Sequence, residues 1–182
     1  WWPYFHAWSA YTARVSAVLQ KARRVPQIAI LSPIEDTWAK YGFNRDSYNY
    51  NPWYLHSIWQ ALNHNGCQTD YISPDVLLKS TAQNDLLTYN GVQFYTLLVL
   101  AEEYMHKDVS NKLEELNKQG VKIIILGDLP TKVLNDPDEE AQPPFSNPED
   151  FTVVRAPGAG EQKSQQALAD FTRQLISAAK IE

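Results

Sequence analysis

The stretch VKIIILGDLP, residues 121–130, decides the fold class that the sequence predicts. Its apolar residues follow one another without alternation and end abruptly in Gly127-Asp128. Such a run is typical of a strand buried on both faces of a parallel sheet. Parallel strands deliver the loops that follow them to the carboxyl edge of the sheet, where α/β proteins bind ligands. The functional question is therefore whether Gly127-Asp128-Leu129 forms an active-site turn or only ends a strand.

Strands and helices alternate along the rest of the chain. Apolar runs predict parallel strands near 27–32, 68–72, 96–101 and 121–126, and amphipathic patterns between them predict helices. Asn90-Gly91 predicts a hairpin that interrupts the parallel order. The alternation predicts an α/β three-layer sandwich with a mostly parallel sheet, which is flavodoxin-like or class I glutamine amidotransferase-like.

Composition divides the chain into an N-terminal helix and one larger domain. Residues 1–25 carry apolar side chains at steps of three and four, and WWPYFHAW holds five aromatic residues in eight. Because such a segment is costly to leave in water, we expect it to pack on this domain or to end a linker from a missing one. Residues 26–182 form the predicted α/β domain, with a proline-rich acidic loop at 135–150 and a last edge strand within 151–157.

Composition also argues against several classes of protein. The net charge is −5 without a basic stripe, which argues against nucleic-acid binding, and no apolar run approaches the ~20 residues of a membrane span. A single cysteine, Cys67, excludes an internal disulfide and a multi-thiolate metal site. The loop after the first predicted strand, SPIEDTWAKYG, lacks the glycines of a phosphate loop. The histidines are too dispersed for a metal site. We therefore expect neither a metal nor an organic cofactor.

The turn after residues 121–126 lacks a nucleophile. Amidotransferase-like folds place a Cys or Ser on a strained turn at this point, but Gly127, Asp128 and Leu129 offer neither a thiol nor a hydroxyl. Cys67 begins a predicted strand and so lies at the opposite edge of the sheet. Asp128 remains a candidate sheet-edge carboxylate, although an Asp that ends a strand more often caps a turn.

Two acidic pairs follow predicted parallel strands. Glu35 and Asp36 follow the first strand, and Glu102 and Glu103 follow the third, so all four belong at the same edge of the sheet. Two carboxylates at about 5–10 Å are what glycoside hydrolysis requires. The pairs are therefore candidates for catalysis, while acidic strand ends without a catalytic role remain the simpler interpretation.

Residues 38–54 are unusually rich in aromatic side chains. Their rings can stack on the apolar face of a sugar while neighbouring polar groups bind its hydroxyls. They are equally suited to burial against a neighbouring domain, because Tyr and Trp are enriched in interfaces. The candidate carbohydrate-binding or interface residues are Glu35, Asp36, Trp38, Tyr41, Tyr48, Tyr50 and Trp53.

Several stretches together resemble one enzyme family. They are the helix with Tyr11, Arg14 and Leu19, the segment QTDYISPDVLL, and the line NGVQFYTLLVL before GVKIIILGDLP. Through them residues 1–130 resemble the region that follows the catalytic barrel in bacterial glycoside hydrolase family 106, the α-L-rhamnosidase type. The chain departs from the family in having Ala22-Arg23-Arg24 before the first strand and in lacking the barrel.

The resemblance implies an accessory domain, inactive alone, of a bacterial glycoside hydrolase acting on plant-type polysaccharide. It implies that Gly127-Asp128 only ends a strand and that the location is periplasmic or extracellular. The implied partners are the catalytic barrel of the same full-length protein and an oligosaccharide, rather than a nucleic acid or a membrane. The alternative is a stand-alone carbohydrate-active hydrolase that uses carboxylates such as Glu35, Asp36 or Glu102.

Overall fold

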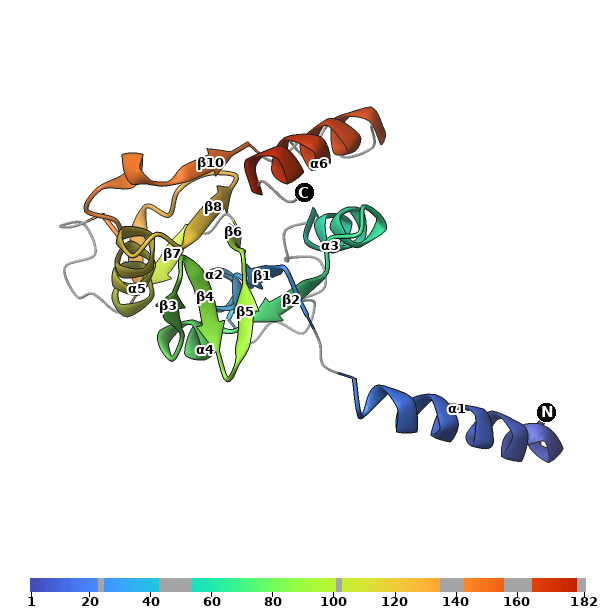
Figure 1. Cartoon of the computed structure of the whole chain (residues 1–182). Coiled ribbons are helices and arrows are strands. Elements are labelled where there is room, and N and C mark those ends of the chain that lie inside the picture. The colour runs from blue at the N-terminus through green and yellow to red at the C-terminus, as the bar shows by residue number, and fades with distance from the viewer. Residues whose placement is uncertain (23–24, 43–53, 101–102, 135–142, 156–164, 180–182) are drawn as a thin grey trace.

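The protein is an α/β sandwich built on a five-stranded parallel sheet. The structure is a computed structural model that describes residues 1–22, 25–42, 54–100, 103–134, 143–155 and 165–179 (Figure 1). The strands lie in the order β10-β8-β6-β1-β2, and every neighbouring pair is parallel. They are β1 (Ile28–Leu31), β2 (Thr69–Ile72), β6 (Thr96–Leu100), β8 (Lys122–Leu126) and β10 (Thr152–Val154). Counted along the chain, this is the order 2-1-3-4-5 of flavodoxin-like sheets.

Helices cover both faces of this sheet, so the predicted three-layer sandwich is confirmed. Helices α3 (Tyr54–His64) and α6 (Gln165–Ala179) pack on one face, and α4 (Pro74–Leu78) and α5 (Lys107–Lys118) on the other. Alternate residues of each strand enter the two cores, because successive side chains point to opposite faces. On the α3 side the core includes Ile30, Leu98 and Ile124, and on the α5 side Leu31, Leu97 and Ile123.

The predicted hairpin at Asn90-Gly91 is also confirmed. It joins β4 (Leu86–Tyr89) to β5 (Val92–Phe94), and both turn residues have positive φ, 48° and 76°. The sequence analysis did not predict a third strand, β3 (Thr81–Gln83), which pairs with β4 and completes a small antiparallel sheet. It also missed the two-stranded parallel sheet of β7 (Tyr104–His106) and β9 (Lys132–Leu134).

The remaining helices are α1 (Phe5–Leu19), preceded by η1 (Trp2–Tyr4), α2 (Ile34–Tyr41) and η3 (Pro148–Asp150). Figure 1 shows α1 extending away from the sheet, and none of its residues is buried. That residues 1–25 end a linker stays a prediction. Part of the predicted loop, 135–142, lies outside the described residues, but Phe145 is buried beside Phe151 and the α5 core.

Candidate functional site

The switch point of the sheet lies between β1 and β6. Strand β1 has β2 on one side and β6 on the other. The chain leaving β1 therefore returns on one side of the sheet, and the chain leaving β6 returns on the other. In open α/β sheets the carboxyl ends of two such strands border the ligand-binding crevice. Here α2 follows β1 and β7 follows β6, and these two elements contact each other.

Asp36 fastens α2 to β7. The residue is 7% exposed, and its Oδ1 accepts hydrogen bonds from the backbone N–H groups of Glu103 and Tyr104, both at 2.9 Å. Lys40, one helical turn later, places Nζ 3.1 Å from Oδ2. Both oxygens of Asp36 are thus engaged by protein groups, which suits a residue that holds two elements together.

Glu103 lies between two lysines. Its carboxylate is 2.7 Å from Lys132 Nζ and 3.3 Å from Lys40 Nζ. The hydrogen bond from Lys132, followed by that from Lys40, lowers the pKa of Glu103. The Lys132 ammonium also donates to the Tyr104 hydroxyl at 3.1 Å, and its pKa is raised by Glu103 first and by Tyr104 second. Burial lowers the pKa of Lys40, but the carboxylates of Asp36 and Glu103 outweigh it, so that pKa is raised.

Glu35 is in a different environment, because it is paired with a histidine. Its Oε1 is 3.8 Å from Nε2 of His106, the residue that precedes α5. Burial raises the pKa of the Glu35 carboxyl, opposed by the charge and backbone hydrogen bond of His106 and increased by Asp75. The Glu35 side chain is 20% exposed and that of His106 36%. Both therefore remain accessible to a ligand.

An exposed aromatic residue lies on the same helix as Glu35, three residues further along. Trp38 is 68% exposed and lies on α2. Its side chain shares a face of the helix with Glu35, because residues at i and i+3 are neighbours about 5–6 Å apart. Asp36 and Lys40 occupy another face of the same helix. Helix α2 therefore presents a ring and a carboxylate together.

The other predicted site residues are only partly described. Tyr41 ends α2, and its side chain lies outside the described part, as do Tyr48, Tyr50, Trp53 and Glu102 entirely. Asp128 is exposed in the turn after β8, and Gly127 has a φ of 98° that suits glycine.

Sequence reasoning placed Glu35, Asp36 and Glu103 at this edge but missed the groups that surround them. These are Lys40, Tyr104, His106 and Lys132. No short motif marks them, because β7 was not predicted and its partner β9 follows more than twenty residues later in the chain. Within the described chain, no three His, Cys, Asp or Glu side chains gather as a metal site.

Comparison with known proteins assigns no family to the chain. No family model and no curated protein matches the chain. The structure is similar to the sugar isomerase domain of an RpiR transcription factor from Sphaerobacter thermophilus. The TM-score is 0.39, with 12% identity over 91% of this chain and 75% of that one. No helix in the described ranges is long and apolar enough to cross a membrane.

The family 106 expectation is wrong on these findings. Neither a family model nor a curated glycosidase matches, and the similar structure is a domain of a transcription factor. The accessory role in polysaccharide breakdown and the catalytic barrel as a partner are therefore not retained, and the implied location loses its basis. The stand-alone hydrolase is not retained either: no comparison points to a hydrolase, and the carboxylate of Asp36 is engaged by Lys40 and two backbone N–H groups.

Proposed function

We propose that the carboxyl edge at the β1/β6 switch point binds a small uncharged ligand rich in hydroxyl groups, of the sugar or polyol class. The observation that carries the proposal is that α2, fastened to β7, carries Glu35 and the exposed Trp38 on one face, with Glu35 paired with His106. A sugar presents an apolar ring face together with hydroxyls that both donate and accept hydrogen bonds. Trp38 supplies a flat apolar surface, and Glu35 with His106 supplies acceptors and a donor.

The charged groups at the α2–β7 contact favour a neutral ligand over an anionic one. Asp36 and Glu103 carry two negative charges, and Lys40 and Lys132 carry two positive charges that contact them directly. These four groups satisfy one another, so no lysine among them is left to balance a phosphate. The loop after β1 also lacks the glycine-rich backbone that usually cradles phosphate.

A direct binding measurement tests this function. Isothermal titration of the chain with neutral monosaccharides and glycerol should give dissociation constants in the millimolar range, since one ring and two polar groups offer only about 4 kcal/mol. The corresponding sugar phosphates should bind no more tightly.

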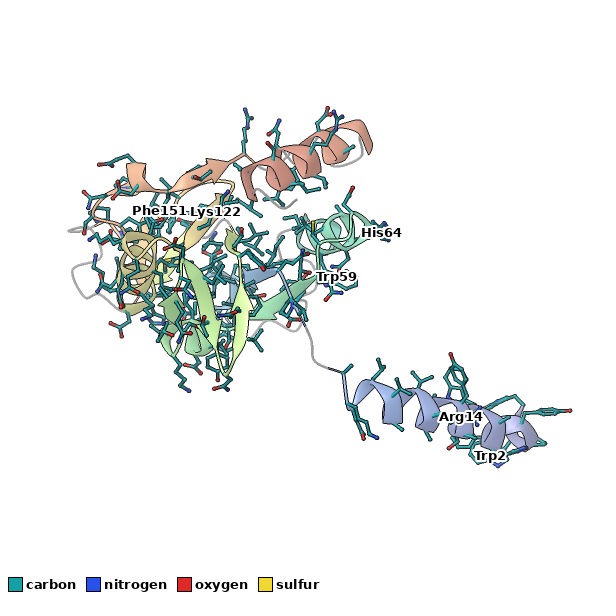
Figure 2. All side chains as sticks on the ribbon, viewed as in Figure 1. Trp2, Arg14, Trp59, His64, Lys122 and Phe151 are labelled. Atoms are coloured by element: carbon teal, nitrogen blue, oxygen red, sulfur yellow. The ribbon has the colours of Figure 1, made fainter. Side chains whose placement is uncertain are left out.

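Matched variants locate the binding. Trp38→Ala should raise the dissociation constant at least fivefold, and Glu35→Gln severalfold. Trp59→Ala is the control, because Trp59 lies on α3 rather than on α2 (Figure 2). Equal losses in the two tryptophan variants, or tighter binding of the phosphates, would contradict the proposed site.

A further inference from the structure

Helix α1 carries an exposed stripe of mostly apolar side chains. Its seam, at alternating steps of three and four residues, is Phe5, Trp8, Thr12, Val15 and Leu19. None of these residues is buried, and Trp8 is 64% exposed. Figure 2 shows η1 and α1 away from the sheet, with Trp2 at the N-terminal end and Arg14 on α1. We propose that this seam is a dimerisation surface on which α1 of a second copy of the chain packs in antiparallel orientation.

The spacing of the seam is that of a coiled coil. Apolar residues that alternate at three and four steps stay on the facing side of a paired helix as it supercoils. Thr12 is the one polar member, and its hydroxyl lies 3.1 Å from the carbonyl oxygen of Trp8 and 3.0 Å from that of Ser9. Because the hydroxyl is satisfied by its own helix, the methyl group of Thr12 can be buried without an unpaired polar atom.

The distribution of side-chain size along α1 selects the antiparallel orientation. The N-terminal end is bulky, since Trp2 stacks on Phe5 with ring centroids 5.2 Å apart, and Trp8 follows. The C-terminal end has the smaller Val15 and Leu19. A parallel pair would bring Trp8 against Trp8, whereas an antiparallel pair places Trp8 opposite Leu19. Large residues facing smaller ones fill a core without voids or overlap.

The two flanks of the seam favour the same orientation. One flank carries Tyr4, Tyr11 and Val18, and the other carries Ser9 and Ser16. An antiparallel pair brings like flanks together, so Tyr11 meets Val18 of the second copy, and serines meet serines. A parallel pair would place the aromatic flank against the serine flank and leave it half-exposed.

Charge separation and area also fit a second copy. Helix α1 contains no acidic residue, its basic residue Arg14 lies near its middle, and Lys21 lies just beyond its C-terminal end. With Trp8 opposite Leu19, antiparallel packing sends Lys21 of the two copies to opposite ends of the pair. At about 100 Å² for each aromatic residue and somewhat less for each aliphatic one, the two stripes bury roughly 1,000 Å², the lower limit for a specific interface. We therefore expect a dimer with a dissociation constant in the micromolar range.

Sedimentation equilibrium of the full chain across the micromolar range tests the dimer. The wild type should associate, and Val15→Asp should raise the dissociation constant at least about a hundredfold, because it buries a charge in the seam. Ala17→Asp adds the same charge on the opposite face of α1 and should leave the dimer intact. A wild type that stays monomeric, or a Val15→Asp variant that dimerises like the wild type, overturns the proposal.

Disulfide trapping tests the orientation. A mixture of Trp8→Cys and Leu19→Cys chains should form a cross-linked heterodimer under mild oxidation, while each variant alone should remain uncross-linked. The wild type is the control, since its Cys67 is buried. Cross-linking of Trp8→Cys to itself would show a parallel pair and overturn the antiparallel arrangement.

Discussion

Removing the Asp36 carboxylate should loosen the contact between α2 and β7. In Asp36→Ala the backbone N–H groups of Glu103 and Tyr104 lose an acceptor that both reach at 2.9 Å, and Lys40 loses one of its two carboxylate partners. Asp36 is only 7% exposed, so these hydrogen bonds are largely shielded from solvent. Each hydrogen bond to a charged acceptor contributes about 1.5–3 kcal/mol, and water entering the vacated space recovers part of the loss. We expect the free energy of unfolding to fall by about 3 kcal/mol.

Asp36→Asn separates the hydrogen bonds from the ion pair. The amide keeps one oxygen for the two N–H groups but cannot pair with Lys40, whose side chain is 30% exposed. A partly exposed ion pair contributes about 0–1 kcal/mol. The asparagine variant should therefore lose about 1 kcal/mol, a third of the loss in the alanine variant.

Urea unfolding, followed by far-ultraviolet circular dichroism, measures both losses. Asp128→Asn is the matched control, because Asp128 is exposed after β8, and a surface change of this kind stays within ±0.5 kcal/mol. Amide hydrogen exchange should show the N–H groups of Glu103 and Tyr104 less protected in Asp36→Ala. Unchanged protection of these two amides, or equal losses in the alanine and asparagine variants, would refute the fastening role.

Three further perturbations have defined outcomes. Lys132→Met should raise the pKa of Glu103 measured by NMR, because the hydrogen bond from Lys132 is the main reason that this pKa is lowered. The Glu103 carboxylate stabilises the fold at a pH above its unfolded pKa, and this contribution is lost as the pH falls through its folded pKa. Burial raises the pKa of Glu35 in the folded state, so the contribution of Glu35 to stability is lost as the pH rises from the pKa of the unfolded carboxyl through that of the folded one. Glu35→Gln should therefore make the urea midpoint less dependent on pH between these two pKa values. Gly120→Ala should lower the free energy of unfolding by about 2 kcal/mol and Gly66→Ala by about 1 kcal/mol, as measured by thermal unfolding. Both glycines have positive φ (91° and 83°), but a Cβ at residue 120 would also collide with a side chain of the β3–β4 turn.

The proposed site also links stability to binding. Glu35 and Asp36 are neighbours on α2, and Asp36 holds that helix against the strand that ends in His106. Asp36→Asn is therefore expected to weaken sugar binding only slightly, whereas Asp36→Ala should weaken it as much as Glu35→Gln. A binding constant unaffected by Asp36→Ala would place the ligand away from α2.

Local pattern was sufficient to predict the fold class. The apolar run at 121–126 forms β8, the run at 96–101 forms β6, and Asn90-Gly91 forms the hairpin turn. Each of these predictions depends on a preference within a few residues, namely the burial of a continuous apolar strand or the tolerance of positive φ. Parallel neighbours joined by helical crossovers then leave few possible arrangements of the sheet.

The resemblance to a glycosidase family depended on short sequence segments whose strand pattern is common in α/β proteins. Segments such as NGVQFYTLLVL predict a hairpin followed by a buried strand, which many α/β proteins contain. They predicted the architecture correctly and the function wrongly. The chemistry of a site depends on side chains that such segments do not include.

Only the tertiary structure determined how the sheet-edge residues are used. The sequence placed Asp36 and Glu103 at one edge, but the hydrogen bond from the Glu103 N–H to Asp36 joins residues 67 positions apart. Lys132 reaches Glu103 because β9 pairs with β7, a contact between two short strands without a strong pattern of their own. The raised pKa of Glu35 likewise comes from burial by packed neighbours. Propensity and periodicity act within one element, whereas ion pairing and desolvation depend on which elements the folded chain brings together.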